Sequence, residues 1–309
     1  MAHAILWRYA FRGIKLIKRK AFAKINLALD ILGKRSDGYH TVRMIMQTID
    51  LYDTVTVDLL DNTSPRVSFS VDIADNKAVP AGIPTGDDNL CVRAANALIK
   101  RSGIRRAVSI HLTKRIPAEA GLAGGSTDAA AVLSGLNELL NIDYTIDGLS
   151  EIAVPLGADI PYCLRGGTML AEGIGEELSG IEPQADGVAV VLIKPDFGMS
   201  TGMIYTQYDS LSEHRHPDID GLIDLIQRRR LIDMKSCAGN VLEEVAVKIR
   251  PEISDIKTYL NKSGAFFSSV TGSGPTVYGL FSDKAQASFA AQEAKSSFPG
   301  YFVYNTVTV

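Results

Sequence analysis

The sequence predicts an α+β protein of two domains, with an active site in the crevice between them. The first observation is length, because 309 residues exceed the roughly 100–200 residues of a typical single domain. The second is a mixture of strand and helix patterns that restarts after about residue 182. The third is a pair of glycine-rich loops, one in each block, which can close on one ligand from opposite sides.

The first block begins with β-rich segments in which apolar and polar residues alternate, as at Val55, Val57 and Leu59. Asp88 is a candidate N-cap for the first predicted helix. In order, the predicted elements are a strand at 21–32, a turn at 33–38, strands at 42–60 and 67–73, a loop at 75–88, a helix at 89–100, a strand at 107–112, a glycine-rich loop at 117–125, helices at 126–140 and 147–156, and a strand at 162–171.

The second block again mixes strands and helices. We predict strands at 188–193, 266–270, 276–281 and 301–308, and helices at 201–209, 219–229, 247–261 and 284–296. The predicted domain limits are therefore 21–182 and 183–309, preceded by a basic extension at 1–20. That extension mixes apolar and basic residues, so it is either a membrane-surface helix or, as we favour, a segment that the fold does not need.

Composition excludes several functional classes. The formal net charge of -3 provides no positive field for a nucleic-acid backbone, so we expect no nucleic-acid partner. The three cysteines form no C-x-x-C pair, which argues against a disulfide framework or zinc site and suits a cytoplasmic protein. No apolar run approaches the roughly 20 residues that span a bilayer, so we expect no membrane partner.

The first glycine-rich loop, residues 117–125, stands between a predicted strand and a predicted helix. Glycines let the backbone approach a ligand closely, and the unpaired N–H groups at a helix start attract phosphate. Ser126 and Thr127 add hydroxyl groups that can reach a phosphate oxygen or a metal ion. The alternative is a tight turn at Gly124 and Gly125, followed by Ser126 as an ordinary helix cap.

Two other kinase signatures are absent or incomplete. No G-K-[ST] follows the first loop, so it is not a Walker A loop. Asp196-Phe197-Gly198 spells D-F-G, but no H-R-D-x-x-x-x-N precedes it, so the match is a coincidence. The second glycine-rich loop, residues 271–276, lies between two predicted strands and by itself is equally consistent with a plain turn.

Three polar residues are candidates for chemistry. Lys24 and Asn26 alternate with apolar residues, so both project from one face of the first predicted strand. Asp159 lies at a predicted break between a helix and a strand. The alternatives are an edge-strand lysine that discourages aggregation and an ordinary turn aspartate.

Five motifs occur together in a fixed order: A-K-I-N-L at 23–27, D-G-Y-H at 37–40, P-x-x-A-G-L-A-G-G-S-T-D-A-A at 117–130, L-G-A-D-I-P at 156–161 and T-G-S-G-P-T at 271–276. This set resembles the GHMP kinase superfamily from about residue 22 to the end of the chain. Its D-G-Y-H and G-A-D-I-P elements resemble a branch that phosphorylates a cytidine diphosphate-linked sugar alcohol in isoprenoid precursor synthesis. The resemblance implies an N-terminal domain like ribosomal protein S5 domain 2 and a ferredoxin-like C-terminal domain.

The resemblance also implies roles for individual residues. Lys24 and Asp159 match the catalytic pair. The acceptor substrate would contact Asn26, Tyr39, His40, Thr201 and Tyr205, with the cytosine ring held by Tyr39 and His40 and covered by Tyr205. ATP would bind at Pro117, Ala118, Glu119, Ala120, Gly121, Leu122, Ala123, Gly124, Gly125, Ser126 and Thr127, near the second loop's Gly272, Ser273 and Gly274, with adenine beside Asn89, Leu90 and Lys114.

The implied mechanism is ATP-dependent phosphoryl transfer with Mg²⁺, in which Asp159 accepts the proton of the acceptor hydroxyl and Lys24 stabilises charge. The metal ligands cannot be named from the pattern. Ala123 stands where relatives often carry glycine, and Asn240-Val241-Leu242-Glu243 lacks one acidic residue of an N-D-L-E element. The alternatives are a GHMP kinase for another alcohol, such as homoserine or mevalonate, and a catalytically silent nucleotide-binding relative.

Overall fold

The computed structural model describes residues 9–11, 14–61, 66–74, 83–211 and 214–309. These residues divide into two compact units that are interleaved along the chain. Unit 1 comprises the described residues among Met1–Ala23, Leu51–Ile116 and Ala123–Gly166, and unit 2 comprises those among Lys24–Asp50, Pro117–Leu122 and Gly167–Val309. We predict domains that follow one another along the chain, and the predicted limits at 20 and 182 stay a prediction.

Two long strands, β2 (Ile14–Lys34) and β3 (His40–Leu60), contribute residues to both units. In unit 1 the strand order is β1-β2-β3-β5-β4, with β1 at Tyr9–Phe11, β4 at Arg66–Ile73 and β5 at Ala107–Lys114. β5 runs antiparallel to β3 and parallel to β4, and Val108 is paired with Leu59 on one side and Val67 on the other. Alternate residues of β5 are buried, which is the period of two that the sequence predicts.

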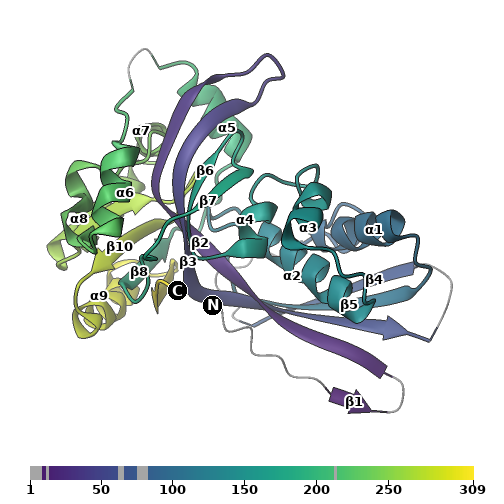
Figure 1. Ribbon diagram of the computed structural model, residues 1–309. Helices are drawn as coiled ribbons and strands as arrows, with labels where there is room; N and C mark the ends of the chain where they lie inside the picture. Colours follow the sequence, from purple (N-terminus) through teal and green to yellow (C-terminus); the bar gives the residue numbers. More distant parts are fainter. Residues whose placement is uncertain (1–8, 12–13, 62–65, 75–82, 212–213) are drawn as a thin grey trace. The chain divides into compact units, whose positions relative to one another are not determined.

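The helices of unit 1 are α1 (Leu90–Ser102), α2 (Gly124–Leu139), α3 (Ile146–Ala153) and α4 (Ile160–Arg165). Figure 1 shows them gathered on one face of β4 and β5. The core between these layers includes Ile17, Leu98, Ile110 and Leu133. A Cβ at Gly135 of α2 would lie 3.2 Å from Ile17, so this glycine makes room for the start of β2. Residues 14–20 form the start of a strand, and Ile17 lies in the core, so both the membrane-surface helix and a segment that the fold does not need are wrong for them.

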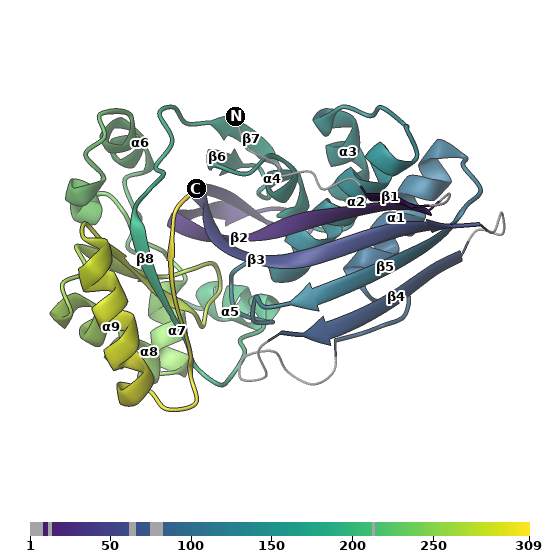
Figure 2. The same cartoon turned by 90° about the horizontal axis from the view of Figure 1, so that it is seen from below.

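Unit 2 contains a sheet with the order β11-β8-β10-β9, formed by Phe302–Val307, Ala189–Lys194, Val277–Phe281 and Phe267–Val270. Its neighbouring strands are antiparallel, and every residue of the central strand β8 is buried. This burial explains the unbroken apolar run before Lys194. Helices α8 (Glu252–Lys262) and α9 (Lys284–Ser297) cover one face of this sheet (Figure 2).

The remaining elements of unit 2 include β6 (Thr168–Glu172), which pairs antiparallel with both β3 and β7 (Glu177–Gly180). The further helices are α5 (Thr201–Tyr208), α6 (Ile219–Gln227), a 3₁₀ helix at Leu231–Ser236 and α7 (Glu243–Ile249). Both units mix helices with a sheet, which confirms the predicted α+β class.

Two predicted elements need correction. The predicted strand at 162–171 is wrong in its first half, because Ile160–Arg165 form α4 and the strand β6 begins only at Thr168. The predicted helix at 247–261 is two helices, since α7 ends at Ile249 and α8 begins at Glu252, after Pro251. A proline ring cannot continue a preceding helix without losing a hydrogen bond, which accounts for the break. Part of the predicted loop at 75–88, residues 75–82, lies outside the described residues.

Among the described residues, the structure contains no helix that is both long enough and apolar enough to cross a membrane.

Candidate active site

The first glycine-rich loop enters α2 through a left-handed residue, Ala123, whose φ is 57°. The helix then begins at Gly124, two residues before the predicted start at 126. A Cβ at Gly124 would lie 2.9 Å from the Lys114 ammonium nitrogen and 3.1 Å from Ile116, so a side chain there does not fit. The first-turn N–H groups of a helix have no intrahelical acceptor, and the helix dipole adds positive charge, so this end of α2 suits a phosphate.

A buried ionic cluster lies beneath that loop in unit 1. The Lys114 ammonium donates to Asp128 at 2.7 Å and also to Asp53, and all three side chains are almost fully buried. Asp53 additionally accepts the backbone N–H groups of Arg115 and Ile116. Burial lowers the pKa of Lys114, but the two carboxylates outweigh that effect and raise it. Sequence reasoning named Lys114 but missed both of its partners.

The other residues named for adenine lie at the start of α1. The N-cap of this helix is Asn89, so the prediction of Asp88 is wrong by one residue. The Asn89 side chain accepts from the N–H of Cys91 at 2.8 Å and donates to the carbonyl of Pro84 at 2.7 Å. Leu90 follows it, half-buried, and its Cδ1 lies 3.4 Å from the position that a Cβ on Gly125 would take. The structure thus places Leu90, Lys114 and the start of α2 close together in unit 1.

The start of the first glycine-rich loop, Pro117–Leu122, belongs to unit 2, where it touches the second glycine-rich loop. Gly121 has φ of 71°, and a Cβ added to it would lie only 2.1 Å from the carbonyl oxygen of Thr271. Gly272 and Gly274 also have positive φ, at 56° and 82°. The two loops are therefore in backbone contact, and glycine at position 121 is required by that contact.

Lys24 and Asn26 project from the same face of β2, as their spacing predicts. The Lys24 ammonium donates to the Asn26 side-chain oxygen at 2.7 Å and to the carbonyl of Gly121 at 3.1 Å. The hydroxyl of Thr271 accepts the backbone N–H of Asn26 at 3.1 Å and itself donates to the Gly121 carbonyl at 3.2 Å. Lys24 and Asn26 are 4% and 1% exposed, so this polar group is built into the interior of unit 2.

The segment Asn240–Glu243 fixes the second glycine-rich loop from its other side. The Asn240 amide donates to the carbonyls of Val270 and Gly272 at 2.9 and 2.8 Å. Glu243 accepts from the Ser269 hydroxyl at 2.8 Å and from the Val270 N–H at 2.9 Å. The role of this segment was not apparent in the sequence, because its partners lie about thirty residues away along the chain.

The residues predicted to hold a base also gather in unit 2. His40 and Tyr205 have ring centroids 5.0 Å apart with the rings tilted by 47°. His40 Nε2 is hydrogen-bonded to the Asp209 carboxylate at 2.6 Å, and Asp209 also accepts from Lys34 at 2.6 Å. Tyr39, next in the chain, is 60% exposed, so its ring is open to a ligand. No motif in the sequence pointed to Asp209.

Thr201 begins α5, and its hydroxyl lies 2.9 Å from that of Ser273 in the second glycine-rich loop. Glu119 of the first loop lies over Gly198, where a Cβ would come within 2.2 Å of its carboxylate oxygen. The glycine of the D-F-G sequence is therefore explained by packing against Glu119.

Asp159 lies in unit 1, half-buried, immediately before α4. Pro161 stands in the first turn of that helix, where its missing N–H costs nothing. Among the described residues, no three His, Cys, Asp or Glu side chains are placed together to hold a metal ion.

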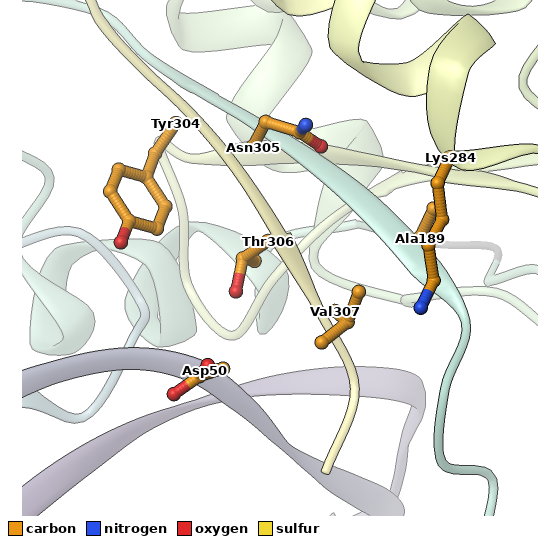
Figure 3. Close-up of a pocket in the computed structure, with 7 residues that line it drawn as sticks. All are labelled: Asp50, Ala189, Lys284, Tyr304, Asn305, Thr306 and Val307. Atoms are coloured by element: carbon orange, nitrogen blue, oxygen red, sulfur yellow. The ribbon is translucent and has the colours of Figure 1, made fainter.

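A separate pocket of about 250 Å³ contains none of the predicted site residues. Figure 3 shows Tyr304 and Lys284 on opposite sides of it. Its lining residues are Asp50, Ala189, Lys284, Tyr304, Asn305, Thr306 and Val307.

Comparison with known proteins bears on this geometry. Residues 89–167 match the GHMP kinases N terminal domain, and residues 216–300 match the GHMP kinases C terminal domain. The 4-diphosphocytidyl-2-C-methyl-D-erythritol kinase of Acetivibrio thermocellus is 42% identical over 291 residues, which cover 94% of this chain and 99% of that relative. The chain belongs to this kinase family. The predicted family is thereby confirmed.

Solved structures agree with this membership. A crystal structure of 4-(cytidine 5'-diphospho)-2C-methyl-D-erythritol kinase superposes with a TM-score of 0.75 at 29% identity, covering 94% of this chain and 99% of that one. L. major mevalonate kinase in complex with R-mevalonate superposes with a TM-score of 0.73 at 14% identity, covering 100% of this chain and 98% of that one. The second likeness shows the shared GHMP kinase fold alone.

Proposed function

We propose that this protein uses ATP to phosphorylate the 2-hydroxyl of 4-diphosphocytidyl-2-C-methyl-D-erythritol, giving the 2-phosphate and ADP in non-mevalonate isoprenoid synthesis. The observation that supports this acceptor best is the aromatic group of Tyr39, His40 and Tyr205 in unit 2. Aromatic rings provide stacking surfaces for a base, and hydrogen bonds to the ring edge select which base binds.

The cysteines are free thiols, in keeping with a protein that acts in the reducing cytoplasm.

We assign the ATP phosphates to the N-terminal end of α2, where the first-turn N–H groups have no intrahelical acceptor. The adenine would lie near Leu90 and Asn89. Because the Lys114 ammonium is engaged by two carboxylates, its contribution there is to support the loop from below. We propose Mg²⁺ as the accompanying ion, which neutralises charge on the phosphates when bound. The Ser126 hydroxyl in the first turn of α2 is an oxygen donor of the type that this ion accepts.

The remaining chemistry belongs to two side chains. We assign to Asp159 the acceptance of the proton from the acceptor hydroxyl, a general-base contribution of roughly 10²–10⁴-fold. We assign to Lys24 the stabilisation of negative charge on the transferred phosphoryl group or the attacking oxygen. The contacts of Lys24 with Asn26 and Gly121 hold its ammonium in one position, which is what electrostatic stabilisation of a transition state requires.

Two other functions account for the residues of the site less well. Homoserine and mevalonate have no base to stack, so they leave Tyr39 and Tyr205 unexplained. A silent nucleotide-binding relative would have no use for Lys24 and Asp159, and this chain has both.

The test is ADP release by the purified protein with ATP and magnesium. The cytidine acceptor, homoserine and mevalonate are supplied separately at equal concentration. Turnover with the cytidine acceptor alone is the expected result. Turnover with either of the other alcohols, or with none while ATP still binds, refutes the proposed acceptor.

A further inference from the structure

Asp209 forms hydrogen bonds with two residues of the proposed base site, His40 and Tyr205. It caps the C-terminus of α5, one turn after Tyr205, and its N–H donates to the Tyr205 carbonyl at 3.0 Å. One carboxylate oxygen accepts from His40 Nε2 and the other from the Lys34 ammonium, both at 2.6 Å. The end of this helix thus presents an aromatic ring and a carboxylate to the same histidine, whose side chain is only 8% exposed.

This contact decides where the proton sits on His40. The hydrogen bonds from Lys34 and His40 hold the pKa of Asp209 below its usual range, so the carboxylate is ionised at neutral pH. An ionised carboxylate is an acceptor only, so Nε2 of His40 must carry a hydrogen. In the neutral imidazole the other ring nitrogen, Nδ1, is then an acceptor.

We propose that Asp209 determines base specificity by fixing this tautomer. With Nδ1 as an acceptor, His40 accepts a hydrogen bond from the exocyclic 4-amino group of a cytosine. A uracil presents a carbonyl oxygen at the same position, and two acceptors that face each other repel. Asp209 is thus a positioning residue that acts through His40, and the inference rests on the proposed function.

Lys34 makes the proposal testable with a single conservative change. Its ammonium has only donors, so in Asp209→Asn the amide oxygen turns toward Lys34 and the amide N–H toward His40. Nε2 of His40 then accepts, and the hydrogen moves to Nδ1, which becomes a donor. The histidine now complements the uracil carbonyl and opposes the cytosine amino group.

The experiment measures kcat/KM for the cytidine acceptor and for the matching uridine diphosphate compound, on the same preparations of the wild-type protein and the Asp209→Asn variant. We expect the cytidine-to-uridine ratio to fall by about 10- to 100-fold, the penalty of one mispaired hydrogen bond. The change should appear mainly in KM, because Asp209 takes no part in phosphoryl transfer. Using one preparation for both substrates removes any effect of a reduced folded fraction.

The matched control is Asp220→Asn, which makes the same change in another carboxylate that is paired with a cation, Arg43, and that does not contact His40. This variant should keep the wild-type ratio. An unchanged ratio in Asp209→Asn, or an equal fall in both variants, overturns the proposal. Absence of turnover by the wild-type protein with the cytidine acceptor instead overturns the proposed function, so the two failures are distinguishable.

Discussion

The buried cluster beneath α2 contains one ammonium and two carboxylates, so one negative charge has no partner of its own. Asp53 is the better satisfied carboxylate, because it also accepts two backbone N–H groups. Asp128 accepts only from Lys114, and its second oxygen, Oδ1, is buried without a hydrogen-bond partner. Burial, together with the nearby Asp53 carboxylate, raises the pKa of Asp128 to about 8, and we predict that the folded protein keeps this side chain protonated at neutral pH.

The substitution Asp128→Asn tests this assignment. In the unfolded chain an aspartate has a pKa of about 3.9, so between roughly pH 4 and pH 8 folding of the wild-type protein requires uptake of a proton. The free energy of unfolding of the wild-type protein therefore falls with rising pH relative to the variant, which needs no proton. The difference in the free energy of unfolding between the two proteins changes by about 1.4 kcal/mol per pH unit, or roughly 3 kcal/mol between pH 5 and pH 7. It levels off above pH 8.

The assay is urea unfolding of the full chain, followed by circular dichroism at several pH values from 5 to 9. The control is Asp143→Asn, the same change at an exposed loop residue whose φ is 60°, a value that asparagine adopts readily. Its stability relative to the wild-type protein should vary little across this range. A difference between Asp128→Asn and the wild-type protein that is independent of pH refutes the reasoning, because Asp128 would then be ionised throughout.

Three further outcomes are expected. Asp159→Asn should leave acceptor binding nearly intact and lower kcat by about two or more orders of magnitude, so steady-state kinetics with near-normal turnover would exclude Asp159 as the base. Gly121→Ala should destabilise the protein by roughly 1–3 kcal/mol in urea unfolding, because its Cβ meets the Thr271 carbonyl, whereas Gly33→Ala, with nothing within 4 Å, should be nearly neutral. Asn240→Leu should lower the free energy of unfolding by roughly 1–3 kcal/mol for each carbonyl that it leaves unpaired, at Val270 and Gly272. A loss below 1 kcal/mol would contradict the inference that Asn240 fixes the second glycine-rich loop.

Local pattern predicted much of the fold. Alternation of apolar residues correctly indicated the strands around Val55 and Val108, and the glycine-rich loop correctly preceded a helix, now α2. The first half of the predicted strand at 162–171 failed because Tyr162 favours a strand by residue type, whereas Pro161 marks a first helical turn. The extra length of β2 was missed because its basic residues suggested a surface segment.

The candidate site was predictable only as far as its motifs extend. Lys24 and Asn26 are indicated by their spacing, and His40 by its motif. Asp209 and Asp53 are not, because each acts through a partner far away along the chain, and only the fold brings the pairs together. Long-range pairs of this kind have no signature in a single sequence.

The interleaving of the two units limits how acceptor preference can be altered. Tyr39 comes early in the chain and Tyr205 late, yet both belong to the same unit. A single crossover between two relatives, at any point between these two residues, would therefore combine half of one base site with half of another. A chimera that transfers the preference for a nucleotide-linked alcohol must carry residues 24–50 and 167–309 from the same parent, so single-crossover recombination is poorly suited to exchanging acceptors within this fold.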